Sequence, residues 1–212
     1  MEVLELYMEC AITEALGPYK RYGLWLQGCD KNCEGCISVA SQIKGNGYKR
    51  TVDEVVSDVI KQTEIEGVTI SGGEPFLQAE ALVAFLKKVK VKKNIGVVIY
   101  TGYYLTQLEE LAQTELSISS VLSMTDILID GPYVEDLNDD KSLRGSSNQT
   151  VYFLTNRYKM FSESLYGVIG RKTELNFGDK VALIGIPDKK TCALFLKVLR
   201  SKGESNSLIK GE

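Results

Sequence analysis

Three cysteines, Cys29, Cys33 and Cys36, lie within eight residues of this 212-residue chain. Their spacing, Cys-x3-Cys-x2-Cys, supplies three soft thiolate ligands from one short loop, and thiolates are the usual ligands of iron–sulfur clusters. A closed cluster uses four such ligands, so a cluster held here would leave one iron open to another molecule. A structural zinc site is the alternative, but zinc normally completes its set with a fourth Cys or His.

Histidine is absent from the whole sequence. This excludes Ser-His and Cys-His nucleophilic mechanisms and every His-ligated metal site, and it deprives the zinc alternative of a common fourth ligand. The two other cysteines, Cys10 and Cys192, lie far from the cluster of three, and we interpret them as small core residues. Cysteines clustered in this way in a reducing compartment indicate metal binding rather than disulfides.

A second motif, Ser-Gly-Gly-Glu-Pro, occupies residues 71–75. Gly72 and Gly73 lack a Cβ, so at the end of a strand they would let the backbone approach a ligand closely. The Glu74 carboxylate could accept a charge-assisted hydrogen bond from an ammonium group. Taken alone, the segment is equally typical of a turn that enters a helix, with Pro75 near the first helical position.

The elements that must position these motifs alternate between short apolar runs and amphipathic segments, which predicts an α/β fold with a mainly parallel sheet. A first strand over 22–27 leads into the cysteine loop, and a second over 67–71 leads into the Gly-Gly pair. Further strands are predicted over 95–101, 126–130 and 150–153, with a helix over 77–91. Capping boxes predict two more helix starts, one at Thr51 with Glu54 and one at Thr106 with Glu109.

The pattern changes after residue 156, where short strands replace the alternation. Antiparallel strands are predicted over 166–169, 174–177 and 180–184, with turn residues at 176–179. A helix should begin near 187 and run through 199, before a polar tail that frays. We therefore expect a core domain over residues 1–156 and a small α+β extension over 157–212.

The net charge of −3 gives no electrostatic reason to expect nucleic acid or an anionic membrane as a partner. The first residues are acidic where a signal peptide would be basic, and no apolar run approaches the length that spans a bilayer. The expectation is a cytoplasmic protein.

The order of the two motifs resembles the radical S-adenosylmethionine (SAM) superfamily, and the resemblance implies a partial (β/α) barrel. It also implies a [4Fe–4S] cluster on Cys29, Cys33 and Cys36, with the open iron chelating the amino and carboxylate groups of SAM. The reduced cluster would then cleave SAM to methionine and a 5′-deoxyadenosyl radical, while the protein orients the reactants. The residues implied to contact the cofactor are Gly35, Ile37, Gly72, Gly73, Glu74, Pro75, Thr101, Asp130 and Arg144.

Two of these residues also have their own reasons in the sequence. Asp130 ends a predicted buried strand, where β/α folds place functional groups, although turn chemistry explains it equally well. Arg144 begins the donor-rich stretch Arg-Gly-Ser-Ser-Asn-Gln, which suits cradling a carboxylate or a protein strand. Thr101 ends the preceding strand and would line the same cavity as Asp130.

A narrower resemblance is to the activating proteins of anaerobic (class III) ribonucleotide reductase. It is carried by residues 17–18, 24–29, 33–36, 71–78, 100–103, 126–133 and 143–149, in the family's order. It implies hydrogen abstraction from a glycine of a partner, a glycyl radical enzyme, and a reductant such as flavodoxin or ferredoxin. Two alternatives are open: a radical SAM enzyme acting directly on a peptide or small molecule, and a metal-bound binding module without turnover.

Overall fold

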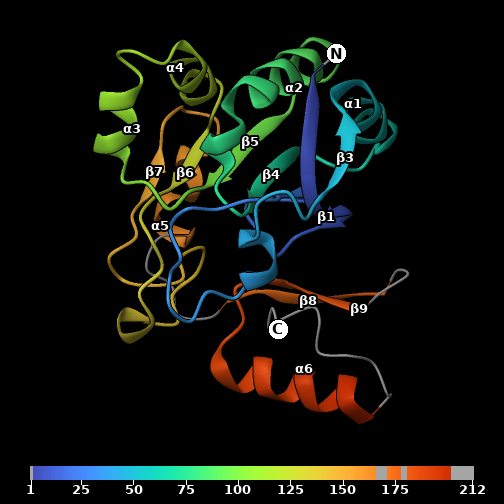
Figure 1. Cartoon of the computed structure of the whole chain (residues 1–212), viewed down its shortest axis with the longest axis vertical. Helices are drawn as coiled ribbons and strands as arrows, with labels where there is room; N and C mark the ends of the chain where they lie inside the picture. The colour runs from blue at the N-terminus through green and yellow to red at the C-terminus, as the bar shows by residue number, and fades with distance from the viewer. Residues whose placement is uncertain (1, 166–170, 178–180, 202–212) are drawn as a thin grey trace.

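The computed structural model describes residues 2–165, 171–177 and 181–201 (Figure 1). Within them, a seven-stranded sheet has the order β3-β1-β2-β4-β5-β6-β7, and β8 and β9 form a separate hairpin. The strands are β1 (Val3–Thr13), β2 (Arg21–Leu26), β3 (Tyr48–Thr51), β4 (Gly67–Gly72), β5 (Gly96–Tyr100), β6 (Ile127–Ile129), β7 (Val151–Phe153), β8 (Thr173–Phe177) and β9 (Val181–Gly185). The α-helices are α1 (Val52–Lys61), α2 (Ala79–Lys92), α3 (Leu105–Leu111), α4 (Leu116–Ser123), α5 (Ser162–Leu165) and α6 (Lys189–Ser201).

The centre of the large sheet is parallel, as the sequence predicted. Strands β2, β4, β5 and β6 pair in parallel, whereas β1, β3 and β7 add antiparallel edges. Leu26 at the end of β2 pairs with Gly72 at the end of β4. The cysteine loop and the Gly-Gly pair therefore begin side by side at one edge of the sheet.

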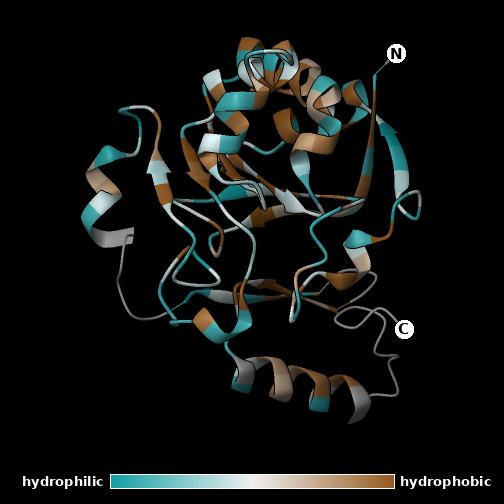
Figure 2. Cartoon of the chain, turned by 60° about the vertical axis from the view of Figure 1, so that its left-hand side comes forward, coloured by the Kyte–Doolittle hydropathy of each residue, from teal (hydrophilic) through white to brown (hydrophobic). Residues whose placement is uncertain are grey.

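Helices α1 to α4 cover one face of the sheet, and β8, β9 and α6 lie on its other side (Figure 1). Side chains alternate across a strand, so each strand contributes to both faces. On the helix side, Ile70 and Ile99 pack in a fully buried cluster with Val55 and Leu86. In Figure 2 hydrophobic ribbon segments lie on the strands and in these helices. On the opposite side, Val98 and Trp25 belong to smaller clusters, and that inner face is the one next to the extension.

Buried Arg21 joins the beginnings of the parallel strands. It donates to the carbonyl oxygens of Val68 (2.7 Å) and Gly96 (3.0 Å) and to the hydroxyls of Thr69 (2.7 Å) and Tyr158 (2.9 Å). A buried charge is tolerated when its donors are paired in this way. The network holds β2, β4 and β5 together at the edge opposite the cysteine loop.

Several sequence predictions of elements were wrong or incomplete. The first strand is β1 rather than the one over 22–27, and neither β3 nor α4 was predicted. The capping box at Thr106 was wrong, because α3 begins at Leu105 and the Gln107 side chain accepts from the Tyr104 amide at 2.9 Å. By contrast, the capping box of Thr51 and Glu54 is confirmed at the start of α1.

The described residues of the segment predicted to be an extension contain the predicted hairpin, β8 paired with β9, and the predicted helix α6. The strand predicted over 166–169, part of the turn over 176–179, and the tail beyond 201 lie outside the described residues. No helix in the described part of the chain is long and apolar enough to cross a membrane.

Candidate iron–sulfur and cofactor site

The cysteine loop leaves the carboxyl end of β2, the edge at which open parallel sheets place their ligands. Its base is closed by backbone and side-chain hydrogen bonds. The Gly28 amide donates to the Ser41 carbonyl at 2.7 Å, and the Cys29 amide to the Gln42 carbonyl at 3.0 Å. The Gln27 side chain donates to two further carbonyl groups of the returning chain, at 2.9 and 2.6 Å. These hydrogen bonds therefore hold the start and the end of the loop together.

The three cysteines lie half-buried on this loop. Between them the chain turns back sharply, because Asn32 (φ 49°) and Gly35 (φ 72°) adopt the left-handed region and the Cys36 amide donates to the Cys33 carbonyl at 3.3 Å. A Cβ on Gly35 would lie 2.7 Å from a carboxylate oxygen of Glu135, so the tip of the loop packs against the segment after β6. A glycine at this position is thus explained by the turn and the packing.

The three thiols do not lie close enough together to form a complete metal-binding site. Among the described residues, no three His, Cys, Asp or Glu side chains converge closely enough to hold a metal ion as they stand. Burial raises the pKa of the Cys29 and Cys36 thiols, which favours the protonated form in the folded chain. Metal binding must displace those protons and draw the sulfurs together. Three thiols on one short loop, with no histidine, fit the soft donor set of an iron–sulfur cluster.

The glycines of the second motif pack against the first motif. Gly72 has φ of 104°, and a Cβ there would lie 2.4 Å from the Leu26 backbone. A Cβ on Gly73 would lie 2.1 Å from the Gly28 carbonyl oxygen. The Gly73 amide donates to the Leu26 carbonyl at 2.7 Å, and the Glu74 amide to the Gly28 carbonyl at 2.8 Å. The close approach that these glycines allow is therefore made by the backbone that carries Cys29.

Glu74 is completely buried beside this junction. Its carboxylate accepts from the amides of Phe76 (3.0 Å) and Gly102 (2.8 Å) and from the Thr101 hydroxyl (2.9 Å). Burial raises the pKa of Glu74 to about 7, although these hydrogen bonds and the Lys31 ammonium act in the opposite direction. With three donors already bound, the Glu74 carboxylate keeps the capacity to accept a further hydrogen bond, which an ammonium group could donate.

Two residues near Glu74 were missed by the sequence analysis. Lys31, from the cysteine loop, places its ammonium 3.2 Å from the centroid of the Tyr103 ring. Lys31 also contributes the positive charge that lowers the pKa of Glu74. Lys31 belongs to no motif, and Tyr103 was noted only as part of the stretch 100–103, so their spatial proximity to Glu74 is what identifies them as site residues.

The remaining predicted residues have contacts within the protein. The Asp130 carboxylate accepts from the amides of Leu105 (2.8 Å) and Thr150 (2.9 Å), which ties α3 to β7 and supports the turn-type interpretation of this residue. The Arg144 guanidinium forms an ion pair with Asp139. Any contact of Arg144 with a cofactor would have to compete with that pair, and its cofactor role stays a prediction.

Ile37 and Pro75 lie on the two motifs as expected. Ile37 directly follows Cys36 and is 40 % exposed, so its side chain is available to a ligand beside the loop. Pro75 is the first residue of the short 3-10 helix Pro75–Gln78, where its missing amide costs no hydrogen bond. The site thus consists of the cysteine loop, buried Glu74 with Thr101, and the backbone junction between them.

Comparison with known proteins identifies relatives of this arrangement. A family described as "4Fe-4S single cluster domain" matches residues 15–152. The anaerobic ribonucleoside-triphosphate reductase-activating protein of Enterobacteria phage T4 is 33% identical over 144 residues, covering 64% of this chain and 85% of the relative. The protein of that name from Escherichia coli K12 is 31% identical over 149 residues, 65% of this chain and 91% of the relative. A pyruvate formate-lyase-activating enzyme of Listeria monocytogenes is 29% identical over 134 residues, 60% and 52% respectively.

Proposed function

This chain belongs to the 4Fe-4S single cluster domain family, and on that premise we propose that it is a radical SAM enzyme that activates a glycyl radical enzyme. Its relatives are activating proteins of anaerobic ribonucleotide reductase and of pyruvate formate-lyase. The reductase-activating relatives are matched over most of their length, so the reductase is the first candidate partner. The observation that carries the proposal is the junction of Gly73 with Gly28, which joins a three-cysteine loop to a buried carboxylate.

In this proposal, different residues of the chain bind the cluster and SAM. Cys29, Cys33 and Cys36 would hold three irons of the cluster, and Glu74 would receive the amino group of SAM. Thr101 orients the Glu74 carboxylate through a 2.9 Å hydrogen bond and accepts from the Tyr103 amide at 3.1 Å. A reduced cluster bound here would supply the electron for reductive cleavage of SAM, the chemistry that would remove a hydrogen atom from a glycine Cα of the partner.

Several finer points belong to the same proposal. Residues 1–156 would form a radical SAM core of the partial-barrel type, and 157–212 an extension. The electron would come from a small protein reductant such as flavodoxin or ferredoxin. The cytoplasm is the proposed location, because a reducing compartment keeps clustered thiols free to bind metal.

An anaerobic mixing experiment tests the activity. Reconstituted protein, SAM, a reductant and either anaerobic ribonucleotide reductase or pyruvate formate-lyase are combined, and the electron paramagnetic resonance spectrum is recorded. A glycyl-type doublet on the partner, with one 5′-deoxyadenosine formed per radical, is expected. SAM cleavage without a doublet on either partner would indicate an enzyme acting directly on another substrate. Reconstituted protein that does not cleave SAM at all would indicate a binding module.

The pKa of Glu74 leads to a prediction about pH. Because burial raises this pKa to about 7, the carboxyl is mostly protonated at pH 6 and attracts an ammonium only as pH rises. The Kd of SAM should therefore fall about eightfold between pH 6 and 7.5, as the ionised fraction grows. Equilibrium dialysis with reconstituted protein measures it.

The Glu74→Gln variant is the matched control, because it keeps the size of the side chain but cannot ionise. Its SAM affinity should be weaker at pH 7.5 and should vary little with pH. A Kd that changes with pH to the same extent in both proteins would assign the titration to the ligand or to another group.

A further inference from the structure

The hairpin of the extension is fixed to the end of β1. The Glu174 carboxylate on β8 accepts from the Thr13 hydroxyl at 2.7 Å and from the Glu14 amide at 3.1 Å. The Asn176 side chain donates to the Cys10 sulfur at 3.0 Å. On β9, Ile184 is 1% exposed and packs in one apolar cluster with Trp25 of the core.

A second anchor ties the extension to the loop that follows β6. The Arg171 side chain, 5% exposed, donates to the carbonyl oxygens of Lys141 (3.2 Å), Arg144 (2.9 Å) and Gly145 (3.0 Å). Three carbonyl groups on one guanidinium hold that loop and the hairpin in a defined relation. With anchors at both β1 and this loop, the hairpin has a set position on the inner side of the sheet.

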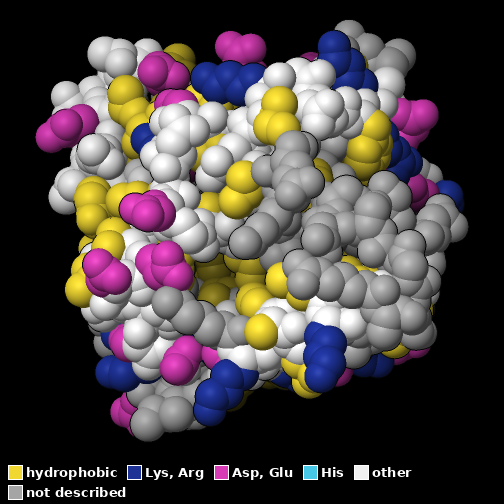
Figure 3. Space-filling model, turned by 60° about the horizontal axis from the view of Figure 1, so that its bottom comes forward, with side chains coloured by type: hydrophobic (Ala, Val, Ile, Leu, Met, Phe, Trp, Pro, Cys, Tyr) yellow, Lys and Arg dark blue, Asp and Glu magenta, His cyan; other side chains and the backbone are white. Residues whose placement is uncertain are grey.

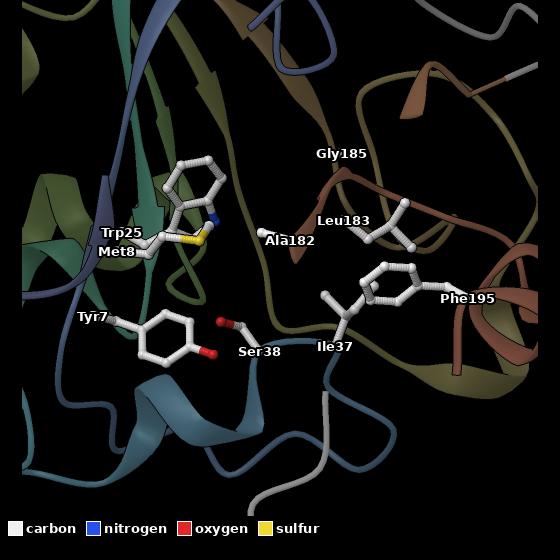
Figure 4. Close-up of a pocket in the computed structure, with 9 residues that line it drawn as sticks. All are labelled: Tyr7, Met8, Trp25, Ile37, Ser38, Ala182, Leu183, Gly185 and Phe195. Atoms are coloured by element: carbon white, nitrogen blue, oxygen red, sulfur yellow. The ribbon is translucent and has the colours of Figure 1, made fainter. Parts of the chain in front are cut away.

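A small cavity lies where the extension meets the cysteine loop (Figure 4). Its volume is about 60 Å³. One side is formed by the core and by the two residues that directly follow Cys36, and the opposite side by β9 and α6. The core side is lined by Tyr7, Met8, Trp25, Ile37 and Ser38, and the extension side by Ala182, Leu183, Gly185 and Phe195.

The size and lining of the cavity restrict what it can admit. Its volume corresponds to roughly four to six water-sized groups, comparable to the four non-hydrogen atoms of one glycine residue. Most of the lining side chains are apolar, and the hydroxyl groups of Tyr7 and Ser38 face one another near one side (Figure 4). The surface seen in Figure 3 is also hollowed, with hydrophobic side chains gathered in the hollow. Such a space fits a segment of backbone without a side chain.

We propose that β9 and α6 form a selectivity wall, made of Ala182, Leu183, Gly185 and Phe195, that decides which glycine-bearing polypeptide segment reaches the cysteine loop. This inference rests on the proposed function and names the part of the chain that recognises its partner. The wall lies entirely outside residues 15–152, the part that matches the family. It is therefore a feature of this chain that shared catalytic chemistry does not require, as expected of a specificity element.

Filling the cavity is the direct test. The Ala182→Leu variant adds three carbon atoms to the selectivity wall, so the glycyl radical formed on the partner should fall at least about tenfold, as for methylene-sized changes in an apolar pocket. SAM cleavage by the reduced variant without partner should stay within about twofold of the parent, because the wall holds none of the predicted cluster or SAM residues. Electron paramagnetic resonance measures the radical, and 5′-deoxyadenosine measures SAM cleavage.

A matched pair on α6 controls for damage to the fold. Phe195 is 5% exposed and lines the cavity, whereas its neighbour Leu194 is 63% exposed. Phe195→Ala should lower the glycyl radical formed on the partner by about tenfold, and Leu194→Ala should not change it. Iron content and thermal unfolding are measured on all three variants, and only those that match the parent are compared.

The outcomes separate this inference from the function on which it rests. If the parent protein does not cleave SAM, the proposed function fails before the selectivity wall is tested. If the parent forms the glycyl radical and Ala182→Leu and Phe195→Ala form it equally well, the wall has no role and the inference is wrong. If Ala182→Leu loses partner-free SAM cleavage and SAM affinity together with the radical, the cavity belongs to the SAM site, which also overturns it.

Discussion

The Cys33→Ala variant is expected to fold but to lose both the cluster and the cleavage of SAM. Cys33 is the middle cysteine, and its charge contributes to the pKa of both Cys29 and Cys36, so it lies within electrostatic range of each. The substitution leaves only two thiolates on the loop, and no other cysteine lies on this loop to replace Cys33. Iron and sulfide bound per chain should fall close to zero, and SAM cleavage by at least about a hundredfold.

Cys192→Ala is the matched control for this variant. Cys192 lies on α6, outside the cysteine loop, and its thiol is also partly buried. Its replacement should leave the iron content and the cleavage of SAM unchanged. The assignment of the ligands would be wrong if Cys33→Ala retained the parental iron content, or if Cys192→Ala lost it.

The second large effect is expected from a single methyl group at Gly73. A Cβ at this position would lie 2.1 Å from the Gly28 carbonyl oxygen, which is backbone and cannot rotate away. Gly73→Ala must therefore push the start of the cysteine loop away from the segment after β4 that carries Glu74. Overpacking of this kind should lower the free energy of unfolding by about 3 kcal/mol, and iron loading should fall because Cys29 moves with Gly28. Urea unfolding of the metal-free protein and iron analysis after reconstitution measure the two effects.

Gly45→Ala separates the steric effect at Gly73 from the general cost of replacing a glycine. Gly45 has φ of 76°, but a Cβ there would meet no atom within 4 Å. Its replacement should therefore cost only the strain of the left-handed backbone, about 1 kcal/mol, with normal iron loading. If both variants loaded iron like the parent, the junction of the two motifs would not be needed to form the cluster site.

Much of the parallel centre could be predicted because its strands are buried on both faces and read as continuous apolar runs. Strand β1 was missed because only alternate residues of its first half, such as Leu4 and Leu6, face the core, with the acidic residue Glu5 between them. Helix α4 was missed because its N-terminus has no side-chain cap, and its identity depends on packing against α2, with Ile118 and Val121 buried in the core on the helix side of the sheet. The hairpin of β8 and β9 was predicted from its short strands and the turn residues between them, but its contacts with the core were not.

The candidate site likewise has features that the sequence predicted and features that only the tertiary structure determined. The ligand set of Cys29, Cys33 and Cys36 follows from local sequence, because the type and spacing of thiolates determine which metals a short loop can hold, and the absence of histidine narrows the choice. The acceptor role of Glu74 was likewise expected from its motif. Its burial, its raised pKa and the proximity of Lys31 were not, since they depend on neighbours brought together from three separate loops.

The remaining features of the site, the contact of Gly73 with Gly28 and the cavity beside the cysteine loop, depend on long-range packing. The reason that Gly73 must be glycine is a contact with Gly28, and the cavity beside the cysteine loop is lined both by Ile37 of that loop and by Phe195 of α6. Residues so far apart in the chain share no local signal, since their proximity arises from the pairing of β2 with β4 and the docking of the hairpin on β1. Residues that are neighbours in the sequence therefore determine the ligand chemistry of the loop. The shape of the cavity proposed to select a substrate depends instead on how distant segments pack.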